Sequence, residues 1–327
     1  MIQFNDDNFY LIITINNFEI LDTIICATNL TQVSKAFNSL SKTSYNKHFE
    51  SIHLYSPAND TERIIEDNTF SGITFDTFYG YKINMIASNA FNNTSKNITK
   101  FICLQCVLNQ TQHEIEFIFN QMINLNYLVI GLNDTELPVL KLPKLEHLTI
   151  KSQQNLTVKL DVFRHLNQIC QIDFQLTAIK KVEKDAFKLK SISNHTEIRI
   201  SFSSCKLSVD LFQNGSFDVS TKFGLSKPII ILFDGANINS NSSYIGYLSE
   251  GAFKSALNNE LSLINLNDPQ YHGGRFNSKL DCNNCKNFWL VKEKKDNQVK
   301  YAYCKDDALI LFDIQIKDKL SQKCNYK

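Results

Sequence analysis

The 327-residue sequence lacks the features that mark several large classes of protein. No run reaches 18 apolar residues, which a membrane-spanning helix needs, and the longest apolar run, Pro228–Phe233, has the length of a strand. The formal net charge is only +1, and no basic run is interleaved with aromatic residues. These absences argue against a membrane span in this chain and against a nucleic-acid partner.

Motifs of catalysis are also absent. The sequence contains no HExxH, no GxSxG, no phosphate-cradling glycine loop and no Walker pattern. Its seven His are dispersed, and none stands at metal-ligand spacing to another. We therefore expect no enzymatic activity, no cofactor and no metal.

The sequence does contain a recurring spacing of apolar residues. Between Leu145 and Ile200, a Phe is followed at +3, +6, +9 and +11 by apolar residues, and a new Phe arrives about two dozen residues later. This period, with a core such as Leu145-x-x-Leu148-x-Ile150, marks a leucine-rich repeat. Side chains alternate along a strand, so Leu148 and Ile150 are expected to point inward. One unit cannot cover its own apolar face, so units must stack.

The sequence therefore predicts an α/β, β-rich leucine-rich repeat solenoid. We expect a curved parallel sheet on its concave side and irregular or short helical segments on its convex side. Residues 30–269 are expected to form about nine repeats, irregular near 71–82 and 213–244, with Leu261–Leu266 as the last strand. Residues 1–29 would hold a first strand near Phe9–Ile15 and a remnant of an N-terminal cap. Residues 270–327 would form a cysteine-rich C-terminal cap.

Potential glycosylation sites are frequent. N-x-S/T sequons begin at 11 positions, about twice the number expected from composition. Chance in an Asn-rich sequence is the alternative, but together with the clustered cysteines we favour a secreted, N-glycosylated protein. No signal peptide is visible, so we expect one upstream of Met1. The sequons begin at Asn29, Asn59, Asn92, Asn93, Asn97, Asn109, Asn133, Asn155, Asn194, Asn214 and Asn241.

The late cysteines belong to a more specific pattern. Leu266-Asn-Asp-Pro269 is followed by Leu280-Asp-Cys282-Asn-Asn-Cys285, then Phe288-Trp-Leu290, then Cys304 and Cys324. This pattern resembles the C-terminal cap of extracellular leucine-rich repeat proteins. It is most similar to secreted arthropod (mite-type) proteins labelled as like the non-catalytic subunit of oplophorus-luciferin 2-monooxygenase. The resemblance covers nearly the whole chain, and it implies the disulfides Cys282–Cys304 and Cys285–Cys324.

The beginning of the chain resembles the same family. Thr23–Val33 looks like the end of an N-terminal cysteine cap and the entry to the first repeat. In the family, the cysteine at Cys26 pairs with one further upstream, and no Cys precedes Cys26 here. We expect either a degenerate cap or a chain that lacks its true beginning, and we favour the second.

A zinc site is the alternative for the four late cysteines. Four-thiolate sites usually come as two close pairs, whereas only Cys282 and Cys285 are close in sequence. Disulfides are the better interpretation, because they would cap an exposed end of the repeat stack.

Cys103 and Cys106 form another CxxC. A thioredoxin-like site needs this motif at the start of a helix, but the repeat register places Cys103 on a strand and Cys106 in a turn. We interpret both as packed structural thiols. A pairing with Cys170 or Cys205 stays open.

The candidate functional surface is the concave face of the sheet. Any one of its residues could be an ordinary solvated strand residue, but stacking makes the whole face a continuous platform. Tyr and Arg are favoured as binding anchors. By register the face carries His53, Tyr55, Tyr127, His147, Lys151, Gln171, Asp173, Arg199 and Asn265.

The function that fits these patterns is an extracellular binding module for a protein or glycoconjugate ligand. One alternative is a non-catalytic subunit of a secreted enzyme complex, which only the family resemblance implies. Another is an intracellular leucine-rich repeat adaptor, which would keep free thiols and carry no glycan. The sequence leaves the ligand and the oligomeric state open.

Overall fold

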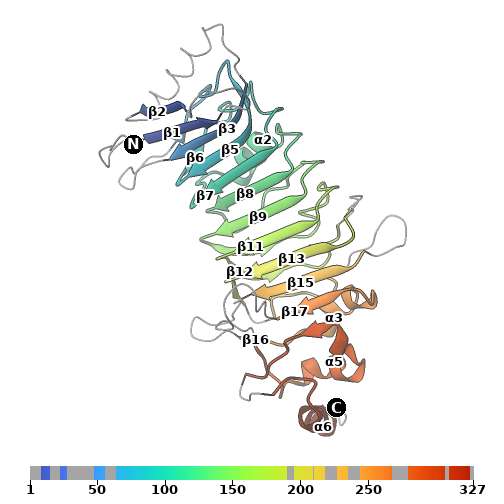
Figure 1. Cartoon of the computed structure of the whole chain (residues 1–327). Coiled ribbons are helices and arrows are strands. Elements are labelled where there is room, and N and C mark those ends of the chain that lie inside the picture. Colours follow the sequence, from blue (N-terminus) through green and yellow to red (C-terminus); the bar gives the residue numbers. More distant parts are fainter. Residues whose placement is uncertain are drawn as a thin grey trace. The chain divides into compact units, whose positions relative to one another are not determined.

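The computed structural model describes residues 9–14, 23–27, 48–55, 64–189, 195–208, 210–217, 227–234, 244–266, 279–305 and 309–324. The protein is α/β, with ten parallel strands in a large open sheet and few helices (Figure 1). It divides into two compact units. The first is Met1–Asp134 with Pro138–Gln153, and the second is Thr135–Leu137 with Gln154–Lys327.

The first unit is built on strands in the order β2-β1-β3-β5-β7-β8-β9. β1 is antiparallel to both β2 and β3, and the pairs from β3 to β9 are all parallel. The strands are β1 (Phe9–Thr14), β2 (Thr23–Ala27), β3 (His48–Tyr55), β5 (Thr74–Tyr81), β7 (Lys100–Leu104), β8 (Tyr127–Leu132) and β9 (His147–Ser152).

Short elements connect these strands. β4 (Ile64–Ile65) pairs in parallel with β6 (Met85–Ile86), and helix α2 spans Gln112–Phe119. A capping box starts α2, because the Thr111 hydroxyl accepts from the Glu114 N–H while the Glu114 carboxylate accepts from the Thr111 N–H. The helix thereby satisfies its first donors and buries Ile115, Ile118 and Phe119.

The second unit repeats this plan with strands in the parallel order β11-β13-β15-β17-β19. A second set of short parallel strands, β10-β12-β14, connects successive strands, and β16 pairs with β18. The strands are β10 (Asn155–Val158), β11 (Gln171–Gln175), β12 (Ala178–Val182), β13 (Ile198–Ser203), β14 (Lys206–Leu207), β15 (Ile229–Asp234), β16 (Tyr244–Gly246), β17 (Leu263–Asn265), β18 (Lys279–Leu280) and β19 (Val299–Lys300).

Short helices follow in the last part of this unit. They are α3 (Glu250–Phe253), η1 (Ala256–Asn258), η2 (Cys285–Asn287), α5 (Phe288–Lys292), η3 (Lys295–Asn297) and α6 (Ile314–Cys324). The indole of Trp289 is buried in α5 and donates to the Leu248 carbonyl at 2.8 Å.

The core consists of residues at equivalent register positions that stack on one another. In the second unit, Phe174, Phe202 and Phe233 form one row with ring centroids 5.3 and 5.2 Å apart. A second row on the connecting segments joins Phe187, Phe217 and Phe253 at 5.0 and 4.9 Å. Burying such a side chain contributes about 2–3 kcal/mol, so these rows hold successive strands in register.

Local backbone geometry also recurs from strand to strand. The residue directly after β5, β7, β11 and β13 has a positive φ of 51–56° in each case. These residues are Lys82, Gln105, Leu176 and Ser204. A non-glycine residue in this region costs about 1–2 kcal/mol, so the packing of the turn onto its neighbours must impose it.

Two details differ from the sequence prediction. Residues 71–82 are not irregular, since β5 is a full strand in which Phe78 pairs with Ile52 and Phe101. The spacing rule missed it because Gly80 occupies an inward position, where Ile83 and Phe78 fill the space of an aliphatic side chain. The parallel sheet also does not end at Leu261–Leu266, because β19 continues it.

Some of the other expectations concern described residues and can be compared with the structure, and others fall outside the described residues. β1 occupies the stretch where a first strand was predicted near Phe9–Ile15. Where irregular or helical connections were expected, β10, β12 and β14 form a ladder of their own. Residues 218–226 and 235–243, in the second stretch expected to be irregular, lie outside the described residues. Within the described ranges, no helix has the length and apolar character to cross a membrane.

Candidate binding surface

Every second residue of the parallel strands faces away from the stacked core, and we call this surface of each unit its open face. In the second unit, register aligns it in three rows. The rows begin at Gln171, Asp173 and Gln175 of β11. The first row continues through Arg199 of β13 to Ile230 of β15. The second continues through Ser201 and Leu232 to Asn265 of β17. The third continues through Ser203 to Asp234.

The open face of the second unit contains a groove of about 180 Å³. Hydrogen bonds fix several of its side chains. Gln171 Nε2 donates to Asp173 Oδ2 at 2.7 Å, and the hydroxyls of Ser201 and Ser203 lie 3.0 Å apart. The residues lining it are Gln171, Asp173, Gln175, Arg199, Ser201, Ser203, Leu232, Phe233, Asp234 and Asn265.

This groove offers hydrogen-bonding groups of every kind beside an apolar side chain. Carboxamides and hydroxyls both donate and accept, the carboxylates accept, and the guanidinium donates. Arg199 is held by Glu197, with its Nε 2.8 Å from Glu197 Oε1, and remains about half exposed. Such a set suits the recognition of a polar ligand.

The open face of the first unit is more aromatic. The rings of His53 and Tyr79 stack with centroids 4.2 Å apart, and His53 Nε2 lies 3.1 Å from Ser51 Oγ. Tyr127 and His147 are neighbours on β8 and β9, with centroids 5.6 Å apart. Aromatic side chains that keep one polar end exposed are common at binding surfaces.

The structure places the predicted residues as register required. His53, Tyr127, His147 and Lys151 lie at open-face positions of the first unit. The backbone of Tyr55 also lies there, paired with Tyr10 and Tyr81, but its side chain lies outside the described residues. The other predicted residues, Gln171, Asp173, Arg199 and Asn265, line the groove of the second unit.

Sequence reasoning missed several members of these surfaces. Tyr79 and Tyr81 belong to β5, within the stretch 71–82 that the sequence analysis expected to be irregular. The groove residues Gln175, Ser201, Ser203 and Asp234 were also overlooked. Alternation alone would have found Gln175 two residues beyond Asp173, and Ser201 and Ser203 beyond Arg199.

The late cysteines form disulfides in the pairs that the family resemblance implied. Cys282 is bonded to Cys304 and Cys285 to Cys324, with Cα atoms 5.3 and 5.5 Å apart. Because all four sulfur atoms are bonded, none of them is a thiolate that could hold zinc.

The interpretation of Cys103 and Cys106 as two thiols was wrong, because they form a disulfide. Cys103 points inward from β7. The chain then turns at Gln105, whose φ is 53°, and brings the Cα of Cys106 within 5.4 Å of that of Cys103. This separation lies in the usual range for a disulfide, and the bridge is buried.

Cys170 and Cys205 are buried thiols. The Cys205 thiol lies in the turn after β13 and donates to the Phe174 carbonyl at 3.2 Å, as expected for a side chain that caps the adjacent turn. Burial raises the pKa of Cys205 to about 12. Cys26 lies in β2, and its side chain is outside the described residues.

The asparagines of the sequons within the described ranges are exposed at the surface. These asparagines are Asn92, Asn93, Asn97, Asn109, Asn133, Asn155 and Asn214. Those at Asn29, Asn59, Asn194 and Asn241 lie outside these ranges.

Some sequon hydroxyls have structural roles of their own. Thr94 Oγ1 accepts from the Phe75 N–H at 3.1 Å, Thr111 caps α2, and the buried Ser216 donates to the Val182 carbonyl at 3.1 Å. These hydrogen bonds would explain a Ser or Thr at these positions even without glycosylation.

Comparison with known proteins leaves the family of this chain unassigned: no family model matches the sequence, and a search of curated proteins found no significant match.

Proposed function

We propose that the chain is an extracellular leucine-rich repeat module that binds a protein or glycoconjugate through its open face, without catalysing a reaction. The observation that carries the proposal is the register of the parallel strands. Equivalent inward residues recur at repeat-like intervals, such as Ile52, Phe78 and Phe101, or Ile172 and Ile200. The intervening side chains then form continuous rows on the open face.

The disulfides support the extracellular part of the proposal. The described residues include three, and disulfides persist in oxidising compartments but are rare in the cytosol. The exposed sequons are compatible with the same location. An intracellular adaptor would instead keep these six cysteines reduced. Intact mass of the native protein, alkylated with and without prior reduction, distinguishes the two possibilities.

The composition of the groove supports a polar ligand. Its carboxamides, hydroxyls and carboxylates come from four neighbouring strands, so they are held by the sheet rather than by a loop. Binding residues on rigid elements lose little conformational entropy on association. Arg199, which lines the groove, is one of the residue types enriched among the anchors of binding surfaces.

The test is a binding screen of the full-length chain against secreted proteins and a glycan array. Any binder is then measured with the triple variant Gln171→Ala, Asp173→Ala and Asn265→Ala. We expect affinity to fall by about tenfold or more, because interface anchors each contribute about 1–2 kcal/mol. The control removes Lys180 and Lys206, which are exposed on β12 and β14. Equal binding by the triple variant and the wild type would refute recognition through the groove of the second unit.

A further inference from the structure

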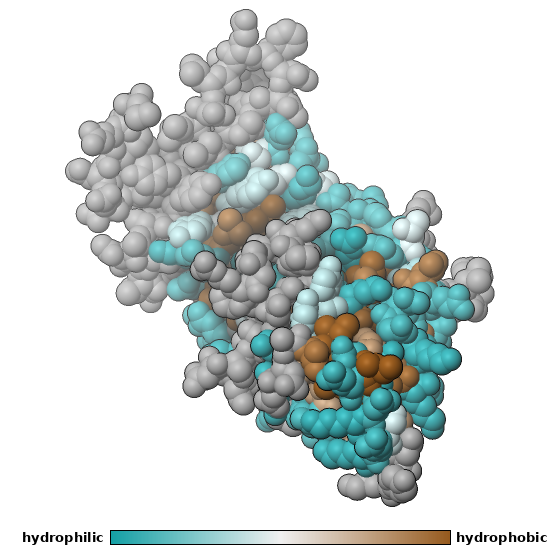
Figure 2. Space-filling view, turned by 60° about the horizontal axis from the view of Figure 1, so that its bottom comes forward, coloured by the Kyte–Doolittle hydropathy of each residue, from teal (hydrophilic) through white to brown (hydrophobic). Residues whose placement is uncertain are grey.

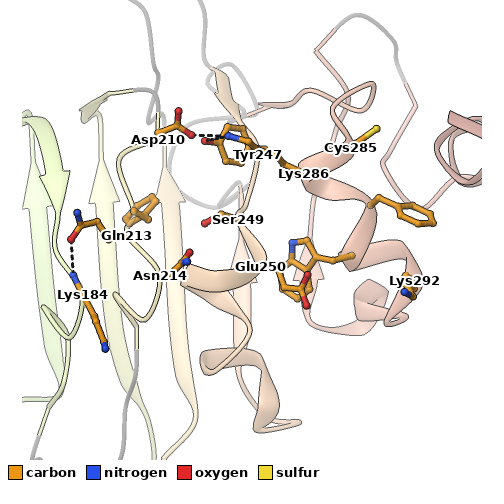
Figure 3. A pocket seen from close by; sticks show the side chains of 13 residues that line it. Lys184, Asp210, Gln213, Asn214, Tyr247, Ser249, Glu250, Cys285, Lys286 and Lys292 are labelled. Carbon is orange, nitrogen blue, oxygen red and sulfur yellow. Dashed lines mark hydrogen bonds and ion pairs between the residues drawn. The ribbon is translucent and has the colours of Figure 1, made fainter. Parts of the chain in front are cut away.

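A second concavity lies in the second unit, away from the open-face groove. It is a cleft of about 860 Å³, within the range of about 300–1,000 Å³ typical of ligand sites. Figure 3 shows Asn214, Ser249 and Tyr247 in its middle, with Lys184 to one side and Lys292 to the other. Its walls come from Lys184, from residues 210–214 and 247–250, and from residues 285–292.

Asn214 belongs to the wall of this cleft and begins the sequon Asn214-Gly215-Ser216. Its carboxamide is positioned by α3, because a Cβ at Gly251 would lie only 2.0 Å from Asn214 Oδ1. The Gly215 N–H donates to the Gly251 carbonyl at 2.7 Å and fixes the same contact. The carboxamide nitrogen, where a glycan attaches, would lie 3.1 Å from the same Cβ, farther than the oxygen. Asn214 is exposed.

The chemistry of the cleft suits a neutral, hydroxyl-rich ligand. Phe212, Tyr247 and Phe288 are half-buried and contribute aromatic surface, and Lys286 Nζ lies over one face of the Tyr247 ring, 4.1 Å from its centroid. The electron-rich face of an aromatic ring attracts the C–H groups of a sugar ring. Figure 2 shows one face of the molecule, on which hydrophobic residues gather in small groups among hydrophilic ones.

The carboxylates of the cleft are already neutralised. Lys286 Nζ lies 2.9 Å from Asp210 Oδ1, and Lys254 Nζ lies 2.8 Å from Glu250 Oε1. Ser249 Oγ is buried and hydrogen-bonds to no other described residue. A buried hydroxyl without a partner costs about 1–3 kcal/mol, so rotation of the Ser249 side chain toward a sugar hydroxyl in the cleft would be favourable.

We propose that this cleft is a saccharide site and that its occupant is the N-linked glycan carried by Asn214. The proposal rests on the extracellular part of the proposed function, because only a secreted chain acquires such a glycan. The glycan is favoured over a free sugar because covalent attachment at the wall makes binding intramolecular, with an effective concentration of about the millimolar range. The packed glycan covers the half-exposed rings and pairs with the Ser249 hydroxyl.

The experiment compares two sequons of the full-length chain, secreted from a eukaryotic host behind a cleavable leader. Glycopeptide mass spectrometry measures occupancy at Asn214 and at the exposed Asn155, and an endoglycosidase then releases glycans from the native protein. We expect both sites to be occupied and release at Asn214 to be about tenfold slower, because a packed glycan must first leave the cleft.

Two variants test the packing itself. Tyr247→Ala removes an aromatic wall, and Ser249→Ala removes only a hydroxyl that has no described protein partner. Each should bring the release rate at Asn214 close to that at Asn155 while leaving the rate at Asn155 unchanged. If Tyr247→Ala does not fold, Ser249→Ala still decides the question.

The outcomes separate the two proposals. Occupancy at Asn155 without occupancy at Asn214, or equal release rates at both sites in the wild type, overturns the assignment of the cleft and leaves the extracellular module standing. Native protein that carries no glycan at any sequon and has reduced cysteines overturns the extracellular module itself.

Discussion

The carboxamide oxygen of Asn287 accepts a hydrogen bond from the backbone N–H of Leu248 at 2.9 Å. The nitrogen of the same side chain donates to the carbonyls of Gly246 at 3.2 Å and Asp281 at 3.0 Å. Asn287 is fully buried and bonds to three backbone groups at once. One side chain thus ties the end of β16 to the segment that follows β18.

Replacement of Asn287 by alanine should therefore destabilise the second unit. The variant leaves the Leu248 N–H without a partner, and a buried unsatisfied group costs about 1–3 kcal/mol. The Gly246 and Asp281 carbonyls lose one of two donors, since they also accept from the N–H groups of Asp281 at 2.6 Å and Asn284 at 3.0 Å. We expect the free energy of unfolding to fall by about 2 kcal/mol in urea denaturation. Asn297→Ala, at an exposed position of η3, is the control and should change it little. A loss at Asn287 no greater than at Asn297 would contradict this assignment.

Two glycines of the first unit should respond differently to alanine. A Cβ at Gly131 would lie 1.8 Å from the backbone oxygen of Cys106, whereas one at Gly80 would meet side-chain ends, with Ile83 Cδ1 at 2.5 Å. Side-chain ends can rotate away, but the Cys106 turn can yield only by moving its backbone. Gly131→Ala should cost about 3 kcal/mol or more and Gly80→Ala about 1 kcal/mol.

Thermal and urea unfolding of the two glycine variants measures this difference. The comparison is matched, since both positions lie in parallel strands of the same sheet. Equal losses would mean that the turn at Cys106 adapts more easily than its close approach to β8 indicates.

The two late disulfides should each stabilise the folded chain by restricting the unfolded one. Their sequence separations are 22 residues for Cys282–Cys304 and 39 residues for Cys285–Cys324. The chain-entropy relation gives about 3–4 kcal/mol for loops of this length. Replacing either pair by serine should lower the midpoint of thermal unfolding, with the larger loss for Cys285–Cys324. A larger loss for Cys282–Cys304 would show that native packing, rather than loop length, dominates.

The sequence predicts the parts of this structure that follow a period. Inward positions such as Ile172 and Ile200, and outward ones such as Asp173 and Arg199, follow from alternation within strands and recurrence between them. The spacing rule fails at Gly80 because the side chains of Ile83 and Phe78 fill the core volume at this inward position. A spacing pattern counts only the side chain at the position itself.

The cleft around Asn214 could not have been predicted in this way. Its members Lys184, Tyr247 and Phe288 come from distant parts of the sequence and share no spacing. The Cys103–Cys106 bridge was missed for a local reason, because it depends on the positive φ of Gln105. A polar side chain in a left-handed turn leaves no clear mark in a single sequence.

The buried Cys205 thiol should make stability depend on pH at the alkaline end. Burial raises its pKa to about 12, above its ordinary value, because the thiolate would lose its solvation. The folded state therefore holds the proton more tightly than the unfolded state. This contribution to stability is fully present below about pH 8.5, where the unfolded thiol is also protonated, and declines as the pH rises toward 12.

The dependence can be measured by urea unfolding between pH 8 and 11 for the wild type and for Cys205→Ala. We expect the free energy of unfolding to fall more steeply with pH in the wild type, because only there does unfolding release this proton. Iodoacetamide should also leave Cys205 unmodified in the native protein at pH 8 and label it after denaturation. Rapid labelling of the native thiol, or identical pH slopes for the two proteins, would mean that the turn after β13 opens readily and that Cys205 is not the closed, capping side chain described here.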